Sequence, residues 1–448
     1  MEPIVFLVAG LLYAGYSIVA GLERDRARRR LWVEAARAQG LSDVTENLAI
    51  FGSTSEVVGK ADRLAVKIET YSVNKNRRGT RIVVEGGDLP VSGLTLRPET
   101  TATALMKRMG AQEFRIGDKT FDDAFYIEGA TAEVYALLDF ETRRDLVALA
   151  ECGTIRIVPG EIQLQLPLDG ADLSTALPHA LDLLMRCARR LTSQHTLLYR
   201  LLGNVQNDPE PGARLANLLV LLREFGNESS LPETLRRACG DASPRVRLHA
   251  ASALGAEGHP VLVELAESAA DDACAARAIE ALGDQLPVER AIAILERALR
   301  YNLRGTAQAC MKALSTFGPS SARGAESLLV EVLQRDDVEL RIAAARALGH
   351  VAAVSAVLPL QETAARIGTP GFLSAARQAV AEIQSRIAGA STGQLSMTGA
   401  DTGRLSMAEA EAGRLTLNDG GRGTVSIATS DPRGPESTPS AAGADDGD

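Results

Sequence analysis

The spacing of apolar residues changes along the chain, and its first stretch predicts a membrane anchor. Residues 3–22, "PIVFLVAGLLYAGYSIVAGL", carry no charge. At about 1.5 Å per residue, a helix of this length matches the hydrocarbon layer of a bilayer. Basic residues flanking such a helix stay in the cytoplasm, and five of them follow: Arg24, Arg26, Arg28, Arg29 and Arg30. We therefore expect a single-pass protein of the cell (inner) membrane, with its amino terminus outside and the bulk of the chain cytoplasmic.

Two alternatives to this anchor at residues 1–22 remain, a cleaved signal peptide and a buried helix of a soluble body. A signal peptide needs Lys or Arg before its apolar run, where only Met1 and Glu2 stand. The next segment, residues 23–46, predicts a basic juxtamembrane helix or linker that contains Trp32. A solvated stalk is the favoured structure there, with arginine contacts to anionic headgroups as the alternative.

Between residues 47 and 203 the spacing predicts an α+β module. Alternation of apolar and polar residues predicts half-buried strands, in three segments: residues 63–73, 80–86 and 113–129, the last with a turn at Gly117 and Asp118. The segment "TIRIVPGEIQLQL" predicts a hairpin that turns at Pro159 and Gly160. Helical spacing predicts two short helices within residues 131–150 and a longer one from about Asp172 to His195.

One motif of this module resembles an uncharacterised module of bacterial single-pass membrane proteins. The motif is "GD..FD..F...G", which begins at Gly117, followed by "LLD..TRRDL". The resemblance covers approximately residues 80–170 and implies no known activity.

Three carboxylates in the module invite a metal interpretation, since hard cations take several oxygen ligands. They are Asp118, Asp122 and Asp123. The spacing lacks the glycine and the twelfth-position glutamate of a calcium loop, and Asp beside Gly is typical of turns. We therefore expect no metal. The basic loop 74–81, which contains Arg78, predicts a charged hairpin tip, with an anion or phospholipid contact as the alternative.

From residue 204 to 388 the helical spacing recurs as an internal repeat. Its anchors are the leucine of Ala-Leu-Gly and its equivalents: Leu222, Leu254, Leu282, Leu314, Leu348 and Val380. The steps between them are 28 to 34 residues, and a second apolar segment lies between most neighbours. One helix pair cannot bury its apolar face alone, so such units stack into a continuous core. We expect an all-α solenoid of about six helix pairs.

Several first helices follow an acidic or hydroxyl residue that can cap a helix: Asp241 and Ser243, then Asp271 and Asp272, then Asp336 and Asp337. Together with Arg247 or Arg341, the alanine run and Ala-Leu-Gly, this layout resembles HEAT-like repeats of the short bacterial type also found beside bilin-lyase proteins. The resemblance implies an extended surface that binds proteins. Two units depart from it, because Ala275 and Ala307 occupy the arginine position.

The last segment has a ten-residue period over residues 389–428. The glycines that begin each unit are Gly393, Gly403, Gly413 and Gly423. Each unit predicts a three-residue strand or, alternatively, a short linear motif on a disordered tail. Ser406 and Thr416 end triplets that a basic-directed kinase could recognise. Residues 429–448 predict a disordered acidic tail.

Composition argues against several functions. The formal charge of −9 is spread along the 448 residues, without the basic stripe of a nucleic-acid-binding protein. Five dispersed cysteines predict buried free thiols rather than disulfides or zinc: Cys152, Cys187, Cys239, Cys274 and Cys310. Five histidines stand outside any HExxH motif: His179, His195, His249, His259 and His350. Nucleotide-binding loops are absent too, so we expect no cofactor and no enzyme.

These patterns predict a non-enzymatic, membrane-tethered scaffold that binds protein partners through the solenoid on the cytoplasmic side. The alternative is an enzyme or small-ligand sensor in the α+β module, with the solenoid as its regulator. A polar, concave pocket within residues 47–200 that gathers Asp118, Asp122 or Arg78 would favour the alternative.

Overall fold

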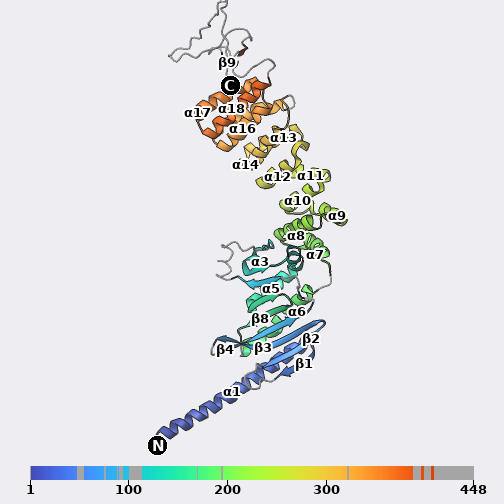
Figure 1. The fold of residues 1–448 in the computed structure, drawn as a ribbon, viewed down its shortest axis with the longest axis vertical. Coiled ribbons are helices and arrows are strands. Elements are labelled where there is room, and N and C mark those ends of the chain that lie inside the picture. The colour runs from blue at the N-terminus through green and yellow to red at the C-terminus, as the bar shows by residue number, and fades with distance from the viewer. Residues whose placement is uncertain are drawn as a thin grey trace, which may run out of the picture. The chain divides into compact units, whose positions relative to one another are not determined.

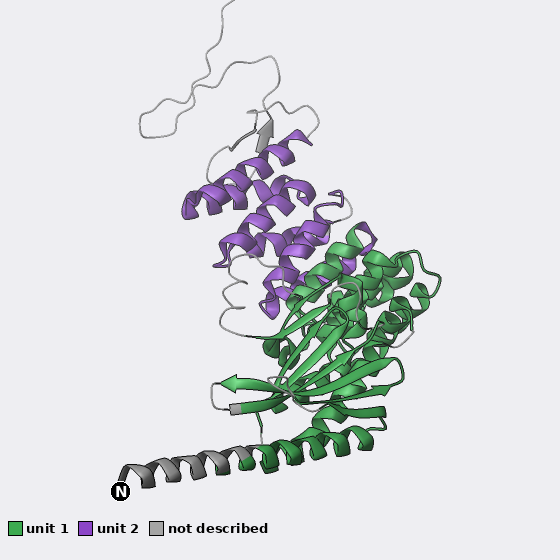
Figure 2. Ribbon diagram, turned by 60° about the horizontal axis from the view of Figure 1, so that its bottom comes forward, with its two compact units in different colours: residues 1–283 green, residues 284–448 purple. Residues whose placement is uncertain are grey.

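The computed structural model is an antiparallel β-sheet region followed by a long run of helices (Figure 1). It describes residues 2–47, 55–74, 77–87, 89, 94–99, 114–168, 170–192, 195–319, 322–386, 395–397 and 405–407. The chain divides into two compact units, Met1–Gly283 and Asp284–Asp448 (Figure 2). The division falls inside the stretch expected to form the solenoid, so the first helical repeats belong to the same unit as the sheet.

The amino-terminal helix α1 runs without a break from Glu2 to Ala38. Among the helices of the described residues, none combines the length and the apolar character needed to cross a membrane. The transmembrane helix expected at residues 3–22 is therefore wrong as an element of this fold. The physical reason is that the apolar run is one part of a longer helix, which continues through the charged residues 23–30 and ends against the sheet. The expected location in the inner membrane stays a prediction.

The carboxy-terminal half of α1 is part of the core of unit 1. Trp32 is 0% exposed, and its Nε1 donates a hydrogen bond to Thr80 Oγ1 over 3.2 Å. Val33, Ala35 and Ala36 are buried beside it. The solvated stalk expected here is wrong, because the small and apolar residues of this half face the protein instead of water.

The sheet has eight strands in the order β1-β2-β3-β4-β8-β7-β5-β6, and all neighbouring strands are antiparallel. Their bounds are β1 Ser42–Asn47, β2 Glu56–Ala61, β3 Leu64–Asn74, β4 Arg77–Glu85, β5 Thr95–Pro98, β6 Phe125–Glu128, β7 Thr154–Val158 and β8 Glu161–Leu166. Val158 pairs with Glu161, which confirms the predicted turn at Pro159 and Gly160. Gly160 has a φ of +79°, a conformation that suits glycine.

Four helices complete the sheet region: α3 Lys119–Ala124, α4 Thr131–Leu137, α5 Phe140–Cys152 and α6 Gly170–Leu191. The two short helices predicted within residues 131–150 are confirmed as α4 and α5. In the segment 113–129, the chain bends at Gly117 where the turn was predicted, but α3 stands between this bend and β6 in place of continued strand. The Asp118 side chain accepts a hydrogen bond from the backbone N–H of Phe121 and so caps α3.

Unit 1 continues with six helices: α7 Leu197–Asn207, α8 Pro211–Glu224, α9 Leu231–Ala238, α10 Pro244–Leu254, α11 His259–Glu267 and α12 Asp272–Leu282. Three of the predicted repeat anchors lie on α8, α10 and α12. Leu282 is buried, whereas Leu222 and Leu254 are half-buried at the edge of a cluster that includes Leu218 and Leu235.

Unit 2 holds α13 Val288–Arg300, α14 Arg304–Leu314, α15 Glu326–Leu333, α16 Val338–Val351, α17 Val357–Ile367 and α18 Pro370–Ser385. The anchors Leu314 and Leu348 are fully buried, and Val380 is half-buried. Helices α14 and α16 and helices α16 and α18 pack directly on each other. Helices thus pack in pairs within each unit, with three of the six repeat anchors buried and three half-buried.

Two of the predicted helix caps are confirmed. Asp271 accepts a hydrogen bond from the N–H of Cys274, and Asp337 accepts from the N–H groups of Glu339 and Leu340. Ser243 precedes α10 but forms no capping hydrogen bond through its side chain. Asp241 instead accepts from the Ser243 N–H and binds Arg214 of α8.

Two short strands lie beyond α18. Leu395–Met397 (β9) pairs antiparallel with Leu405–Met407 (β10), and Ser396 stands opposite Ser406. This pairing is the strand alternative for the first two tail units. The remaining tail predictions lie outside the described residues: Gly393, Gly403, Gly413, Thr416, Gly423 and residues 429–448.

Candidate functional site

Arg143 of α5 is the centre of a buried polar network that joins the sheet region to the first helical repeat. Its side chain is 1% exposed. The guanidinium donates to both carboxylate oxygens of Asp208, over 2.8 and 3.0 Å, and to Asp118 Oδ2 over 2.9 Å. Burial by itself lowers the pKa of Arg143, but the two carboxylates raise it above its ordinary value. This arginine is therefore a charged structural link between α3, α5 and the end of α7.

The carboxylates considered as metal ligands are engaged in this local structure. Asp118 caps α3 and binds Arg143. Asp122 accepts from the N–H groups of Ile116 and Gly117 over 2.8 and 2.9 Å, and burial raises its pKa. The exposed Asp123 lies 3.7 Å from Lys119 Nζ. In the described ranges, no three His, Cys, Asp or Glu side chains are grouped so that they could hold a metal ion.

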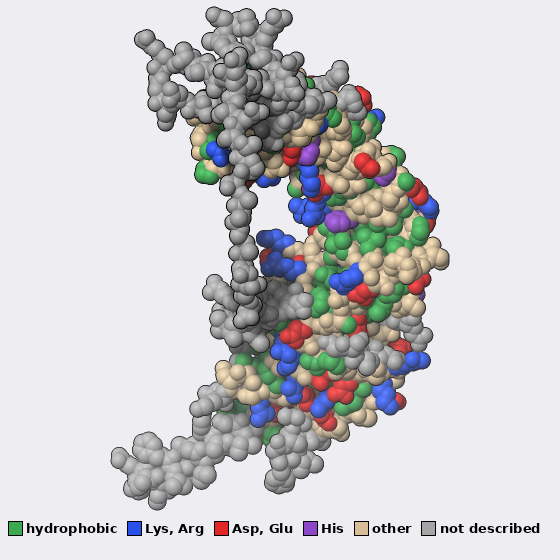
Figure 3. Space-filling model, turned by 45° about the horizontal axis from the view of Figure 1, so that its top comes forward, with side chains coloured by type: hydrophobic (Ala, Val, Ile, Leu, Met, Phe, Trp, Pro, Cys, Tyr) green, Lys and Arg blue, Asp and Glu red, His purple; other side chains and the backbone are tan. Residues whose placement is uncertain are grey.

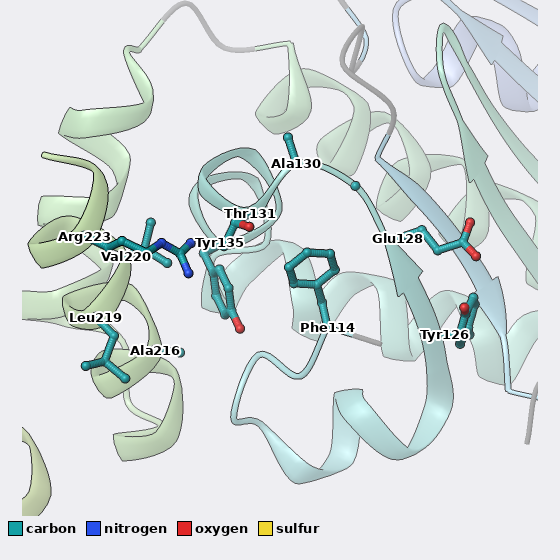
Figure 4. A pocket seen from close by; sticks show the side chains of 11 residues that line it. Phe114, Tyr126, Glu128, Ala130, Thr131, Tyr135, Ala216, Leu219, Val220 and Arg223 are labelled. Atoms are coloured by element: carbon teal, nitrogen blue, oxygen red, sulfur yellow. The ribbon is translucent and has the colours of Figure 1, made fainter. Parts of the chain in front are cut away.

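A cavity of about 710 Å³ opens in unit 1 between β6, α4 and α8 (Figure 4). The rings of Phe114 and Tyr135 meet edge to face, with centroids 6.3 Å apart. Tyr135 donates its hydroxyl hydrogen bond to the carbonyl of Arg115 over 2.9 Å, and burial raises its pKa. Glu128 and Arg223 lie on opposite sides of the cavity in Figure 4. The aromatic pair therefore lies between a carboxylate and a guanidinium group.

A smaller hollow of about 460 Å³ lies beside this cavity, and both are lined by Ala216 and Leu219 of α8. Asp122 lines the smaller hollow, whereas Asp118 turns into the Arg143 network. Arg78 is elsewhere, with its Nη1 3.9 Å from Asp25 of α1. The three residues named for a sensor site are therefore not brought together.

Unit 2 carries an open groove of about 570 Å³ between α14 and α16. The groove is lined by Gln308, Lys312, Ser315, Glu339, Ile342, Ala343, Arg346 and His350. Lys312 and Arg346 each stand two residues before a repeat leucine. Successive repeats thus place a cation at the same position of the groove wall.

The groove has a distinct charge arrangement. Arg346 is exposed and, within the part of the chain that the structure describes, forms no ion pair. Glu339 is already engaged, by Gln308 Nε2 at 3.4 Å and by Arg304 at 3.6 Å. His350 Nε2 lies 3.8 Å from Glu382 of α18. The cation of Arg346 is accordingly available to a carboxylate from outside, above the half-buried Ile342.

The arginines of the repeat signature have a structural role. Arg247 of α10 lies 2.7 Å from Glu264 of α11, and the buried Arg341 lies 3.1 Å from Asp336. Each pair ties a first helix to a neighbouring segment of its own unit. Ala275 and Ala307, which replace this arginine elsewhere, are buried and provide no such link.

The five cysteines are free thiols, of which Cys187, Cys274 and Cys310 are buried as expected, whereas Cys152 and Cys239 are half-buried. Burial raises the pKa of Cys187 and of Cys310 to about 12 and that of Cys274 to about 11. Such thiols carry almost no thiolate at neutral pH and are poor nucleophiles. Among the histidines, His249 has its pKa lowered by burial and by Arg277, and His195 stacks on Tyr199 with ring centroids 4.8 Å apart.

Comparison with known proteins supports the repeat assignment. A family model described as HEAT repeats matches residues 199–283, which cover α7 to α12. Residues 199–283 are similar to HEAT repeats. No curated protein matches the chain. HEAT repeats are typical of non-enzymatic scaffold proteins and commonly mediate protein–protein interactions, so the helical part of this chain suggests an interaction role.

Sequence reasoning missed the residues that line the cavity of unit 1 and the groove between α14 and α16. Phe114, Tyr135 and Arg223 come from segments separated in the chain and meet only in the folded protein. Lys312 and Arg346 could have been found, because aligning the repeats on their leucines places both at one register position.

Proposed function

We propose that the chain is a non-enzymatic scaffold that binds a protein partner through its HEAT-like repeats, and that the groove between α14 and α16 is one contact site. The observation that carries this proposal is the exposed Arg346, which lacks an ion pair among the described residues, beside the equivalent Lys312. An apolar strip of Ile342 and Ala343 accompanies these cations. This combination suits a partner segment that carries Asp or Glu next to an apolar residue.

Site-specific photo-crosslinking in cells tests the proposal. A photoreactive amino acid replaces Gln308 in the groove, and a control chain carries it at Glu296, an exposed position of α13 in the same unit. We expect a discrete protein adduct from position 308 that is absent from position 296. Equal labelling at both positions, or no adduct from either, would contradict a protein partner in this groove.

A second candidate function is small-ligand binding in the cavity of unit 1. The observation in its favour is the aromatic pair of Phe114 and Tyr135 between the opposite charges of Glu128 and Arg223. Such a wall suits a compact ligand with an apolar body and a charged end. A ligand found by thermal-shift screening should lose its effect in Glu128→Gln or Arg223→Gln; an unchanged shift in both variants would exclude this cavity.

We further propose that α1 tethers the scaffold by contact with a lipid surface, a contact that needs no spanning helix. Tyr16, Val19 and Leu22 support this tether, since they are 73%, 56% and 54% exposed and follow each other at three-residue steps. Large apolar side chains on one side of an exposed helix are typical of membrane-surface contacts. Fractionation of cells that express the chain measures whether it is in the membrane fraction. Carbonate extraction of that fraction then measures whether the chain is released, as a surface contact requires.

A further inference from the structure

Two basic segments that are about fifty residues apart in the sequence meet beside α1. Arg78 follows the tip of the hairpin between β3 and β4, and its Nη1 lies 3.9 Å from Asp25 of α1. The hydrogen bond from Trp32 to Thr80 fixes the same hairpin to the same helix two residues further along β4. The basic hairpin between β3 and β4 and the charged part of α1 are distant in the sequence. These two contacts bring them together on the surface of unit 1.

This surface holds several cations that are accessible to an external anion. Arg24, Arg26 and Arg30 are exposed, and within the described structure they form no ion pairs. The side chain of Arg78 is 68% exposed. Arg24 lies on the other side of α1, about 160° around the helix from Arg26. We call Arg26, Arg30 and Arg78 the basic cluster. Cations and anions are interspersed over much of the visible surface (Figure 3), and here the exposed Glu23 and the half-buried Asp25 lie near the arginines.

The basic cluster lies next to the exposed apolar side chains of α1. Val19 and Arg26 are seven residues apart, and Leu22 and Arg30 are eight apart. At 3.6 residues per turn, these spacings place apolar and basic residues on the same side of the helix. A ligand that binds this side of α1 has to contact apolar side chains and, one to two helical turns further along, arginine side chains.

We propose that the basic cluster binds the headgroups of anionic phospholipids, an inference that rests on the proposed contact of α1 with a lipid surface. Phosphate oxygens at the surface of a bilayer accept hydrogen bonds from guanidinium groups, and the acyl layer beneath accepts Val19 and Leu22. A nucleic acid offers the phosphates without the apolar layer, so it leaves the apolar side of α1 without a function. The hairpin thereby adds Arg78 to the lipid contact of a helix that is distant in sequence.

Vesicle co-sedimentation of the purified full-length chain tests this inference. The probes are vesicles of phosphatidylcholine alone and of phosphatidylcholine mixed with phosphatidylglycerol. The variants are Arg26→Glu/Arg30→Glu on the helix and Arg78→Glu on the hairpin. Arg156→Glu, an exposed arginine of β7 in the same unit, is the matched control. Emission of the neighbouring Trp32 reports whether each variant keeps α1 docked.

We expect binding to the mixed vesicles that weakens with salt and falls about thirtyfold or more in Arg26→Glu/Arg30→Glu, from the loss of two arginines near an anionic surface. Arg78→Glu should weaken it by about fivefold or more, and Arg156→Glu should leave it unchanged. Equal binding of the wild type to both vesicles would overturn the headgroup inference and leave the tether standing. Absence of binding to either vesicle would overturn both.

Two further outcomes would also contradict the inference. If the variants with Glu in the basic cluster bind the mixed vesicles as tightly as Arg156→Glu does, the cluster is not the lipid site. If duplex DNA binds as tightly as the mixed vesicles and the same variants abolish that binding, the cluster is a general polyanion site and not a lipid site.

Discussion

Arg143 and Asp208 are 65 residues apart and form a paired hydrogen bond in which both side chains are 1% exposed. The pair joins α5 of the sheet region to the residue that follows α7, the first helix of the repeats. A buried charge remains compatible with folding only while its partner is present. Much of the stability of unit 1 against unfolding should therefore depend on these two residues.

We expect Arg143→Ala to lower the free energy of unfolding by about 3–5 kcal/mol, because it leaves Asp208 buried without its counter-charge. Urea denaturation followed by circular dichroism measures this change. Arg144→Ala is the control, since Arg144 is adjacent but 53% exposed, and its loss should cost about 1 kcal/mol or less. Equal losses in the two variants would show that the Arg143 network does not hold the unit together.

The close approach of Gly117 and Gly212 predicts opposite effects for two glycine substitutions in neighbouring helices. A Cβ at Gly212 of α8 would lie 2.3 Å from the Gly117 carbonyl oxygen, whereas a Cβ at Gly203 of α7 would meet nothing within 4 Å. Gly212→Ala should destabilise unit 1 by about 1–3 kcal/mol through this overlap. Gly203→Ala should stabilise it by about 0.5–1 kcal/mol, since alanine favours helix. Thermal unfolding distinguishes the two, and stabilisation by both would contradict the close contact.

Trp32 provides a direct test of how α1 docks, because it is the only tryptophan of the chain. Its complete burial predicts blue-shifted native emission that iodide quenches poorly, with a red shift on unfolding. Trp32→Ala should cost about 3–5 kcal/mol, as for other large buried aromatics. Emission typical of a water-exposed indole in the native protein would instead support the solvated stalk.

Asp145 predicts part of the acid sensitivity of unit 1. Burial raises its pKa, but hydrogen bonds from Arg190 at 2.9 Å and Arg186 at 3.1 Å lower the pKa below its ordinary value. A carboxylate with a lowered native pKa contributes stability above its unfolded pKa of about 3.9 and loses it as the pH falls through the native value. We expect urea midpoints to fall below about pH 4 and this slope to be shallower in Asp145→Asn. The more exposed Asp182→Asn should keep the slope, and identical slopes in all three proteins would refute this assignment.

The helical repeats were predictable because their signals lie in the sequence itself. The caps at Asp271 and Asp337 depend on residues within one turn, and the leucine anchors recur every 28 to 34 residues along the chain. The turn at Pro159 and Gly160 likewise depends on adjacent residues.

Tertiary contacts were the part that the sequence could not predict. The pairing of Arg143 with Asp208 and the burial of Trp32 depend on contacts between segments 48 to 65 residues apart. The spacing of apolar residues along the chain does not indicate such contacts. The helix α3 was not predicted, because the alternation of apolar residues over residues 113–129 favoured strands. The hydrogen bond by which Asp118 caps α3 is not visible in that pattern. The apolar run at residues 3–22 similarly predicted a separate membrane element, whereas it belongs to the 37-residue helix α1 that docks on the sheet.

The most direct test of the proposed scaffold is the affinity of the groove between α14 and α16 for an acidic segment, measured by fluorescence anisotropy of a labelled poly-glutamate peptide on the full-length chain. Arg346→Glu reverses one of the two cationic positions of the groove and leaves Lys312, and Arg377→Glu on α18 is the matched control outside the groove. The account predicts saturable binding that Arg346→Glu weakens by about fivefold to tenfold and that Arg377→Glu leaves unchanged. Failure of the wild type to bind the peptide, or equal affinity in the three proteins, would contradict it.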